Sequence, residues 1–350
     1  APARPDHKGV PRSAQDSCRF ARISGRLAKS AAIPWELAVS RVDQLMSASK
    51  PWPTDAGLET AMIFLENLDL PNFAAFVLLQ DAKGRAALTR WFEGFLPFAR
   101  AGGTGFVLDT PTWRANMGWA SAMGLDETGL RRVNAEAVAF ARAFRDRHET
   151  ATMPILVNGV VGPSGDGYRI GTALTAEEAE AIHRPQVEAL AEAGVDMVSA
   201  VTMTYAAEAI GIARAAKAAG LPHVLSFTVE TDGHLASGQS LADAIAEVDA
   251  ATGASALFFM VNCAHPTHFT AELRGPHAAR IGGVRANASR LSHAELDEAT
   301  ELDDGDPAEF GALYAGFSGL LPQLRIIGGC CGSDHRHVAA ACAHLHAMAD

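Results

Sequence analysis

Short runs of apolar and β-branched residues alternate along most of this chain with longer, alanine-rich amphipathic stretches. The short runs predict eight strands, which lie at residues 52–57, 105–110, 154–162, 196–202, 223–229, 256–263, 282–288 and 324–331. Helical patterns occupy residues 85–101, 127–148, 175–193, 206–219, 240–252 and 307–320, and a last helix begins near Ser333. Strands that alternate with helices are typical of a parallel sheet.

Two helix starts are marked by capping residues. Thr175 precedes Glu178 by three residues, which is the spacing of a capping box. Ser240 precedes Asp243 at the same spacing and predicts a weaker cap.

The repeated strand–helix unit favours an α/β fold, namely a single (β/α)8 TIM barrel. A doubly wound open sheet is the alternative. No G-x-G-x-x-G follows the first predicted strand, and no Walker loop is present. The glycine-rich "GGTGF" at residues 102–106 precedes a strand, so we interpret it as a helix-to-strand turn.

The first part of the chain lacks this regular pattern. Residues 1–45 are basic, and we expect an irregular N-terminal extension that is peripheral or poorly ordered, with a short helix around residues 33–46. Residues 46–350 are expected to form the barrel domain. Met46 stands just before the regular part, and we hypothesise that the natural chain starts there.

Composition narrows the class of protein. Apolar residues make up 48% of the 350 residues, which is ordinary for a globular protein. The net charge of −11 argues against nucleic acid or an anionic membrane as partner. No apolar run approaches the roughly 20 residues needed to span a bilayer, and no secretory signal precedes the regular part. Five scattered cysteines do not resemble a disulfide framework, so we expect a cytoplasmic protein with free thiols.

Three of these cysteines follow predicted strands. Cys263 ends the sixth strand, and the adjacent Cys330 and Cys331 end the eighth. In a TIM barrel, the carboxyl ends of the strands meet on one face. Three thiolates with an open fourth position are typical of a catalytic zinc site, and soft thiolates select zinc over magnesium. The alternative is three buried, inert cysteines, and Cys18 and Cys342 are interpreted in that way.

The motifs around these cysteines carry a family resemblance. "MVNCAHP" (260–266) and "GGCCG" (328–332) resemble the two zinc motifs of the homocysteine S-methyltransferase family, and "TDAGLET" (54–60) and "VNGVVGPSGDGY" (157–168) resemble its other segments in the same order. The resemblance implies a barrel enzyme that holds Zn²⁺ with Cys263, Cys330 and Cys331. It also implies methyl transfer to a thiol, most simply homocysteine, which gives methionine.

The implied chemistry is physically coherent. A free thiol has a pKa of about 8.5, so only a small fraction is thiolate at neutral pH, and zinc coordination removes the proton. The thiolate then attacks a methyl group on a sulfonium or quaternary ammonium donor, which the negative site attracts. The expected partners are therefore a small-molecule thiol and a methyl donor. The sequence leaves the oligomeric state open, a homo-oligomer included.

The resemblance also implies substrate contacts. Asp55, Asp109, Thr202 and Asn287 match family positions at the ends of the first, second, fourth and seventh strands, and they are predicted to bind substrate. Val201 stands where the family carries a glutamate that binds the homocysteine amino group. An apolar side chain cannot pair with an ammonium group. The acceptor is therefore homocysteine in a rearranged pocket or a different thiol.

Other residues allow two interpretations. Trp113 and Trp119 form an aromatic wall for a cationic donor or pack in the core. Arg285 is a partner for a substrate carboxylate or a structural ion pair, and His337 supports the thiolates or lies in a solvated helical turn. The acidic run at 295–306 is expected to be a solvated loop.

Two other functions remain as alternatives. A zinc-thiolate barrel that binds thiols or senses oxidation would use the same cysteines without methyl transfer. A metal-free barrel enzyme for a phosphorylated sugar would need a glycine-rich phosphate site after the seventh or eighth strand. "GGCCG" has the glycines, but its cysteines serve no phosphate chemistry.

Overall fold

The computed structural model describes residues 39–347, so most of the expected N-terminal extension lies outside the described residues. Within them, one sheet contains eight parallel strands, each of which overlaps a predicted run. They are β1 (Trp52–Pro53), β2 (Phe106–Asp109), β3 (Ile155–Val161), β4 (Met197–Met203), β5 (His223–Phe227), β6 (Phe259–Asn262), β7 (Ile281–Ala286) and β8 (Ile326–Gly329).

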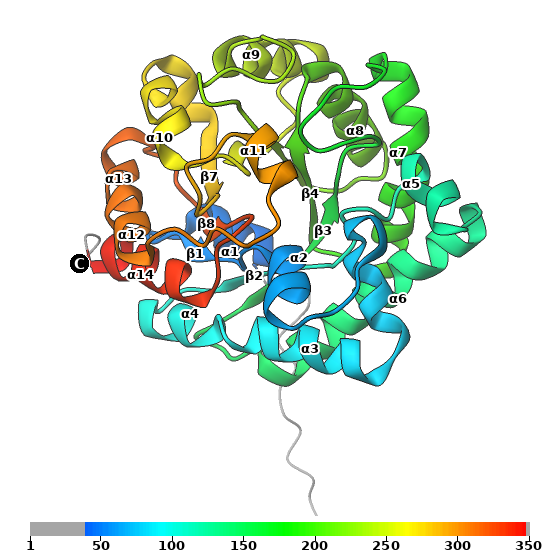
Figure 1. Ribbon diagram of the computed structural model, residues 1–350, viewed down its shortest axis with the longest axis horizontal. Coiled ribbons are helices and arrows are strands. Elements are labelled where there is room, and N and C mark those ends of the chain that lie inside the picture. Colours follow the sequence, from blue (N-terminus) through cyan, green and yellow to red (C-terminus); the bar gives the residue numbers. More distant parts are fainter. Residues whose placement is uncertain (1–38, 348–350) are drawn as a thin grey trace, which may run out of the picture. The chain divides into compact units, whose positions relative to one another are not determined.

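The strands form a nearly closed ring with helices outside it (Figure 1). The hydrogen-bonded order is β1-β8-β7-β6-β5-β4-β3-β2, so each strand from β3 to β8 has a ladder on both sides. No ladder joins β1 to β2, and we call this junction the β1–β2 seam. The fold is a TIM barrel, as predicted, and the open-sheet alternative is wrong.

The helices that the pattern predicted are present, two of them in two parts. They are α3 (Ala82–Glu93), α4 (Leu96–Gly102), α6 (Glu127–His148), α7 (Ala176–Ala193), α8 (Ala206–Ala218), α9 (Leu241–Thr252), α12 (Pro307–Ala315), α13 (Phe317–Leu320) and α14 (His335–Ala347). Two predicted helices are each divided, at Phe95 and at Gly316. The capping box of Thr175 with Glu178 is confirmed, as is the cap that Ser240 provides.

Short helical segments fill the connections that the pattern left unassigned. They are α2 (Leu58–Thr60), η2 (Ala61–Leu65), η3 (Pro71–Phe73), η4 (Ala75–Gln80), α5 (Met117–Ala120), η5 (Ser121–Met123), α10 (Pro266–Phe269), η6 (Thr270–Leu273), η7 (Pro276–Arg280) and α11 (His293–Glu298). The expectation of a plain loop at 295–306 is therefore wrong at its start, because α11 covers the first part of that run.

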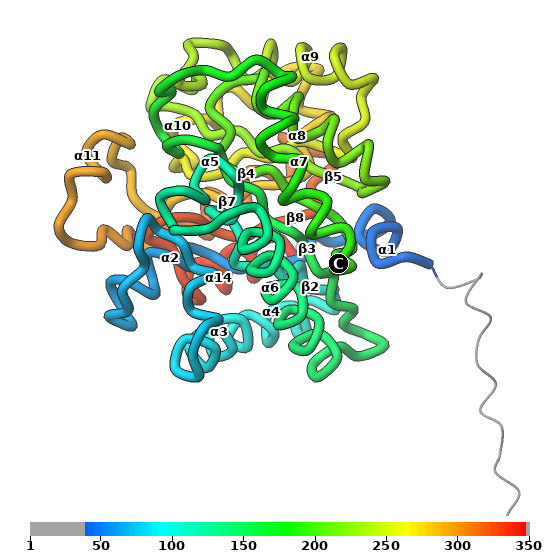
Figure 2. Tube along the Cα trace, turned by 90° about the vertical axis from the view of Figure 1, so that its right-hand side faces the viewer, coloured from blue at the N-terminus to red at the C-terminus, as the bar shows by residue number. Residues whose placement is uncertain are grey.

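A short helix closes the amino end of the barrel. Helix α1 (Arg41–Ser47) buries Val42 and Leu45 in the cluster that fills the barrel interior, and the expected boundary between residues 45 and 46 falls inside it. Figure 2 shows α1 at the opposite end of the barrel from α11. The second, larger core lies between the strands and the surrounding helices. Among residues 39–347, no helix is both long and apolar enough to cross a membrane.

Candidate metal and active site

Three cysteine sulfur atoms meet beyond the carboxyl ends of β6 and β8. The Cys263 Sγ lies 2.8 Å from the Cys330 Sγ and 3.6 Å from the Cys331 Sγ. All three sulfur atoms lie within 4.8 Å of one another, and no other cluster of metal-ligating side chains occurs among the described residues. Cys342 is buried in α14 and takes no part, and Cys18 lies outside the described residues.

The backbone around the cysteines turns sharply. Cys263 has a φ of +57°, in the left-handed region that side chains rarely adopt, and Gly332 has a φ of +77° just after the cysteine pair. The Cys330 N–H donates to the carbonyl of Ala286, and the Cys331 carbonyl accepts from the Ala288 N–H. These bonds fix the turn after β8 against the end of β7. The side chains of Cys330 and Cys331 can therefore both reach the sulfur atom of Cys263.

Two buried side chains hold the carbonyl oxygen of Cys263. The Asn287 Nδ2 donates to it over 3.0 Å, and the His293 Nε2 lies 2.7 Å from it. Asn287 is therefore placed behind Cys263, and it is not among the residues that line the cavity described below. The sequence could not predict this contact. Asn287 bonds to a backbone carbonyl, and every residue has one, so no residue type marks the partner.

The three thiols do not hold their protons equally. Hydrogen bonds from Cys263 and Cys330 lower the pKa of Cys331 well below its ordinary value. The contacts with Cys330 and Cys331, together with burial, raise the pKa of Cys263. For Cys330, the hydrogen bond with Cys263 lowers the pKa. The contact with Cys331 and burial have the opposite and larger effect, and together they raise the pKa of Cys330 to about 12. Without a metal, Cys331 therefore releases its proton more readily than Cys263 or Cys330.

Tyr168 is a functional residue that the sequence reasoning missed. Its hydroxyl lies 3.4 Å from the sulfur atoms of both Cys263 and Cys331. The ring stacks on the imidazole of His293, with 4.1 Å between the ring centroids. The signal available was the position of Tyr168 at the end of the "GPSGDGY" loop after β3, which belongs to the face where the cysteines lie.

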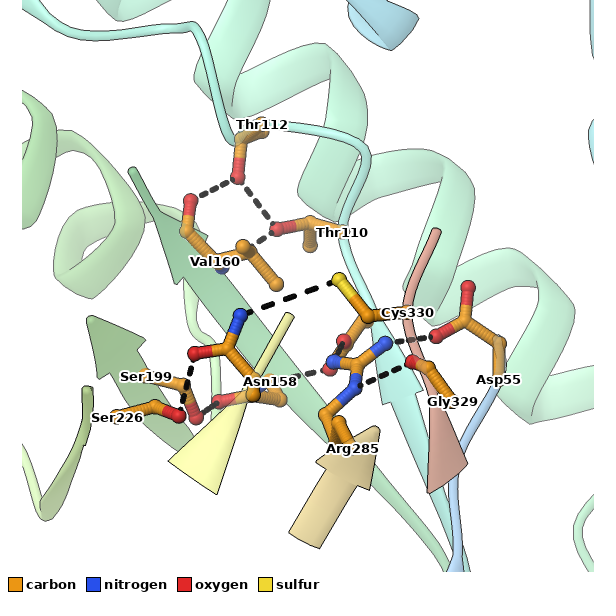
Figure 3. Close-up of polar contacts among 12 residues, drawn as sticks. Asp55, Thr110, Thr112, Asn158, Val160, Ser199, Ser226, Arg285, Gly329 and Cys330 are labelled. Carbon is orange, nitrogen blue, oxygen red and sulfur yellow. Dashed lines mark hydrogen bonds and ion pairs between the residues drawn. The ribbon is translucent and has the colours of Figure 1, made fainter. Parts of the chain in front are cut away.

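Arg285 binds both aspartates that were predicted to contact the substrate. Its guanidinium donates to Asp55 over 2.6 Å and to the carbonyl of Gly329 (Figure 3). It also donates to Asp109. The other Asp55 oxygen accepts from the Trp91 Nε1 at 3.1 Å. Burial raises the pKa of Asp55 to about 7, and Arg285 opposes that rise. Asp55 and Asp109 are thus engaged by protein groups, and Arg285 takes the structural role that the sequence left open.

A buried polar chain continues from Asp109 around the ring. The Asn158 Nδ2 donates to Asp109 over 2.7 Å, and the Ser199 hydroxyl donates to Asn158 over 2.9 Å. On β6, the Asn262 Nδ2 donates to the Thr202 hydroxyl over 2.9 Å, while its Oδ1 accepts from the Thr202 N–H. Thr202 has a φ of +65° at an irregularity of β4, and Asn262 holds it in that conformation.

A cavity of about 440 Å³ opens beside the sulfur atoms. Asp55, Asp109 and Thr202 line it, as do the three cysteines and Tyr168. Val201 contributes an apolar wall where a glutamate would be expected from the resemblance. Such a volume is suited to small-molecule substrates.

The two tryptophans after β2 are already paired with a cation of the protein. The Arg114 guanidinium carbon lies 3.9 Å from the ring centroid of Trp113 and 3.9 Å from that of Trp119. Trp113 lines the cavity, but Trp119 does not. The interpretation that both rings form a wall for a cationic donor is therefore wrong, because Arg114 occupies the cation position.

His337 supports the structure at a distance from the sulfur atoms. Its Nε2 bonds to the carbonyl of Asp304 over 2.8 Å, and its Nδ1 lies 3.1 Å from Asp334. The imidazole is fully buried, so the alternative of a solvated turn is also wrong. His337 instead fixes the segment that follows the cysteine pair.

The chemistry of the sulfur cluster fits a soft divalent metal. Three sulfur donors that follow two strands form a compact triangle, and the Tyr168 hydroxyl lies beside two of them. Hard cations such as Mg²⁺ and Ca²⁺ prefer oxygen donors and are not suited to this set.

Comparisons with known proteins agree with this geometry. The family model described as homocysteine S-methyltransferase matches residues 88–345. Homocysteine S-methyltransferase of Escherichia coli (strain K12) is 30% identical over 264 residues, which cover 71% of this chain and 82% of that protein. Homocysteine S-methyltransferase YbgG of Bacillus subtilis (strain 168) is 25% identical over 249 residues, which cover 65% of this chain and 76% of that protein.

Solved structures give the same result for the fold. The oxidized form of the homocysteine methyltransferase MmuM from Escherichia coli has a TM-score of 0.66 at 25% identity, and the match covers 85% of this chain and 96% of that chain. The metallated form of MmuM has a TM-score of 0.65 at 24% identity, with 84% and 96% covered. The present chain therefore belongs to the homocysteine S-methyltransferase family and is an S-methyltransferase.

Proposed function

We propose that this protein transfers a methyl group from a sulfonium or quaternary ammonium donor to the thiol of homocysteine and so produces methionine. The observation that carries the proposal is the convergence of Cys263, Cys330 and Cys331 beside a cavity of about 440 Å³. Family membership supports the thiol as acceptor, because the relatives named above act on homocysteine.

We propose Zn²⁺ as the metal, held by the three cysteines. Bound there, it supplies Lewis acidity, which lowers the pKa of an acceptor thiol so that the reactive thiolate forms at neutral pH. Asn287 and His293 hold the Cys263 carbonyl, and the turn after β8 holds the other two ligands. Rigid placement of this kind would keep the three sulfur atoms close enough to bind one ion.

In the reaction, a lone pair on the acceptor sulfur forms the new sulfur–carbon bond. The carbon–sulfur or carbon–nitrogen bond of the donor breaks, and its electron pair returns to the donor heteroatom, which becomes neutral. More carboxylate than guanidinium side chains line the cavity, so its charge favours a cationic donor. Asp55, Asp109 and Thr202 are proposed to shape the substrate side of the cavity, with Arg285 fixing the two carboxylates.

A second candidate is methyl transfer to a thiol other than homocysteine. Val201 favours it, because an apolar side chain lines the cavity at the position where the family carries the amino-binding glutamate. The two candidates differ only in the acceptor, so both predict the same metal site.

The first prediction tests this metal site. Cys263→Ser, Cys330→Ser and Cys331→Ser should each lose most of the bound zinc, because an alcohol at neutral pH does not replace a thiolate ligand. Zinc per chain is measured by mass spectrometry of purified protein, and methyl transfer by isotope-labelled donor and a panel of thiols.

Cys342→Ala is the matched control, because it removes a buried thiol that lies outside the cluster. It should keep the zinc content and activity of the unchanged protein. Full zinc in all three serine variants would refute the ligand set, and saturable thiol binding without labelled product would favour the thiol-binding alternative.

A further inference from the structure

The cavity contains two charged side chains of opposite sign that do not pair with each other. Glu59 and Arg114 both line it, and no ion pair joins them. Charged groups at a cavity wall are costly to leave without partners, since they lose part of their hydration. Such groups are therefore candidates for contacts that only a ligand completes.

Glu59 is the carboxylate that remains available. Asp55 and Asp109 each accept from Arg285 and from one further protein donor, namely Trp91 and Asn158. Asp166, Asp297 and Asp303 also line the cavity, and they are engaged by backbone N–H groups, Arg169 and Ser289, respectively. Within the described part of the chain, the Glu59 carboxylate has only its own backbone N–H as a hydrogen-bond partner. Glu301, also at the cavity, is exposed to solvent.

Arg114 presents the opposite charge. It is 7% exposed, its Nη1 donates to the Gly165 carbonyl over 2.8 Å, and its Nε has no hydrogen-bond partner in the described structure. The contacts with two indole rings fix the guanidinium without satisfying that N–H, since they use ring faces. A carboxylate is the ligand group that best matches a guanidinium at a cavity wall.

We propose that Glu59 and Arg114 bind the two charged ends of an acceptor that is an α-amino-acid thiol. Glu59 accepts hydrogen bonds from the ammonium group, and Arg114 donates to the carboxylate. This assignment rests on the proposed function, and it chooses an amino-acid thiol over a thiol without these charges. It also explains how a cavity with Val201 in its wall still recognises an amino group, because helix α2, after β1, supplies the carboxylate of Glu59.

The test compares three thiols as acceptors for the zinc-loaded protein. They are homocysteine, 4-mercaptobutyrate, which lacks the ammonium group, and 3-mercaptopropylamine, which lacks the carboxylate. The unchanged protein should show a kcat/KM for homocysteine about 10- to 100-fold above that for either analogue, the usual range for one charged hydrogen bond. Calorimetric binding of the same three thiols should follow the same order.

Glu59→Gln should lower kcat/KM for homocysteine by about 10- to 100-fold and abolish its advantage over 4-mercaptobutyrate, while its advantage over 3-mercaptopropylamine stays. Arg114→Met should show the reverse pattern, and Arg114→Lys should recover part of the loss. Circular dichroism melting of each variant establishes that it is folded. Glu66→Gln, an exposed carboxylate outside the cavity, is the matched control and should behave as the unchanged protein.

Equal use and equal binding of all three thiols by the unchanged protein would overturn the inference while leaving methyl transfer intact. Unaltered acceptor preference in folded Glu59→Gln would also overturn it. If no thiol receives a methyl group, the proposed function fails, and the calorimetric comparison still decides whether Glu59 and Arg114 select an amino-acid thiol.

Discussion

At the scale of single residues, Glu59 shows how a proposed binding residue can lower the stability of the protein when no ligand is bound. Burial raises its pKa to about 7 from an ordinary value of 4.5, and the nearby Asp55 adds to the rise. The folded protein therefore holds a proton on Glu59 between these two pH values when the unfolded chain has already released it. Stability consequently falls as the pH rises through this window.

Glu59→Gln should thus stabilise the metal-free protein above pH 7. The expected gain in unfolding free energy is on the order of 1 kcal/mol, since the side chain is partly exposed and solvent screens the full effect. Near pH 4 both proteins carry a neutral side chain there, and the difference should vanish. Urea unfolding at pH 4 and pH 8 measures it. A gain of equal size at both pH values would contradict the electrostatic explanation.

Single residues of the site could be predicted where the residue type is rare in the chain, as cysteine is. Cys263, Cys330 and Cys331 could be selected because they follow predicted strands and stand in motifs that resemble the two zinc motifs of the family. Tyr168 could not, because its contact with the sulfur atoms depends on the path of the loop after β3. The pairing of Arg285 with both Asp55 and Asp109 was equally hidden, since it joins β7 to the end of β2 and to the segment after β1.

At the scale of elements, the loop after β3 depends on a buried hydrogen-bonded pair of side chains, Glu208 and His183. The Glu208 carboxylate on α8 accepts from the Ser164 N–H over 2.7 Å and lies 2.9 Å from the His183 Nε2 on α7. Glu208 and His183 are 1% and 0% exposed, so solvent cannot replace either contact. This anchor sets the start of the loop that ends in Tyr168.

Glu208→Ala should loosen that loop. Removing the carboxylate leaves a buried imidazole and a backbone N–H without partners, which should cost about 2–4 kcal/mol of unfolding free energy. Hydrogen–deuterium exchange should become faster at residues 162–168 than in the strands. Glu208→Gln, which keeps an acceptor oxygen, should show a smaller effect. Unchanged exchange in the alanine variant would show that other contacts hold the loop.

Elements with a long periodic pattern were predicted well, and short ones were not. Helix α6 spans Glu127–His148, the range that the pattern predicted, because its apolar face recurs over many turns. The segments α2, η2, η3 and η4 between Leu58 and Gln80 were missed. One or two turns contain too few residues for a period to be recognised, and their form depends on packing beside the barrel.

At the scale of the whole molecule, the β1–β2 seam distinguishes this barrel from a fully hydrogen-bonded ring. β1 has only two residues and pairs with β8 alone, while β2 pairs with β3 alone. Arg285 on β7 reaches Asp55 after β1 and Asp109 at the end of β2. One side chain therefore connects the two strands that lack a ladder.

Arg285→Met should destabilise the protein strongly. It leaves two buried carboxylates without their counter-ion, so a loss of about 3–5 kcal/mol in unfolding free energy is expected at neutral pH, measured by urea denaturation. Arg290→Met is the control, because its ion pair with Glu309 is exposed and should contribute less than about 1 kcal/mol. A loss no larger than that of the control would show that the seam is held by backbone packing instead.

The seam also makes the closure of the barrel depend on electrostatics. Every other junction between neighbouring strands has a ladder of backbone hydrogen bonds, whereas β1 and β2 are connected through Arg285 and the two aspartates beside it. A change in the charge of any of these three side chains therefore weakens the connection between β1 and β2, and no backbone ladder there compensates for it.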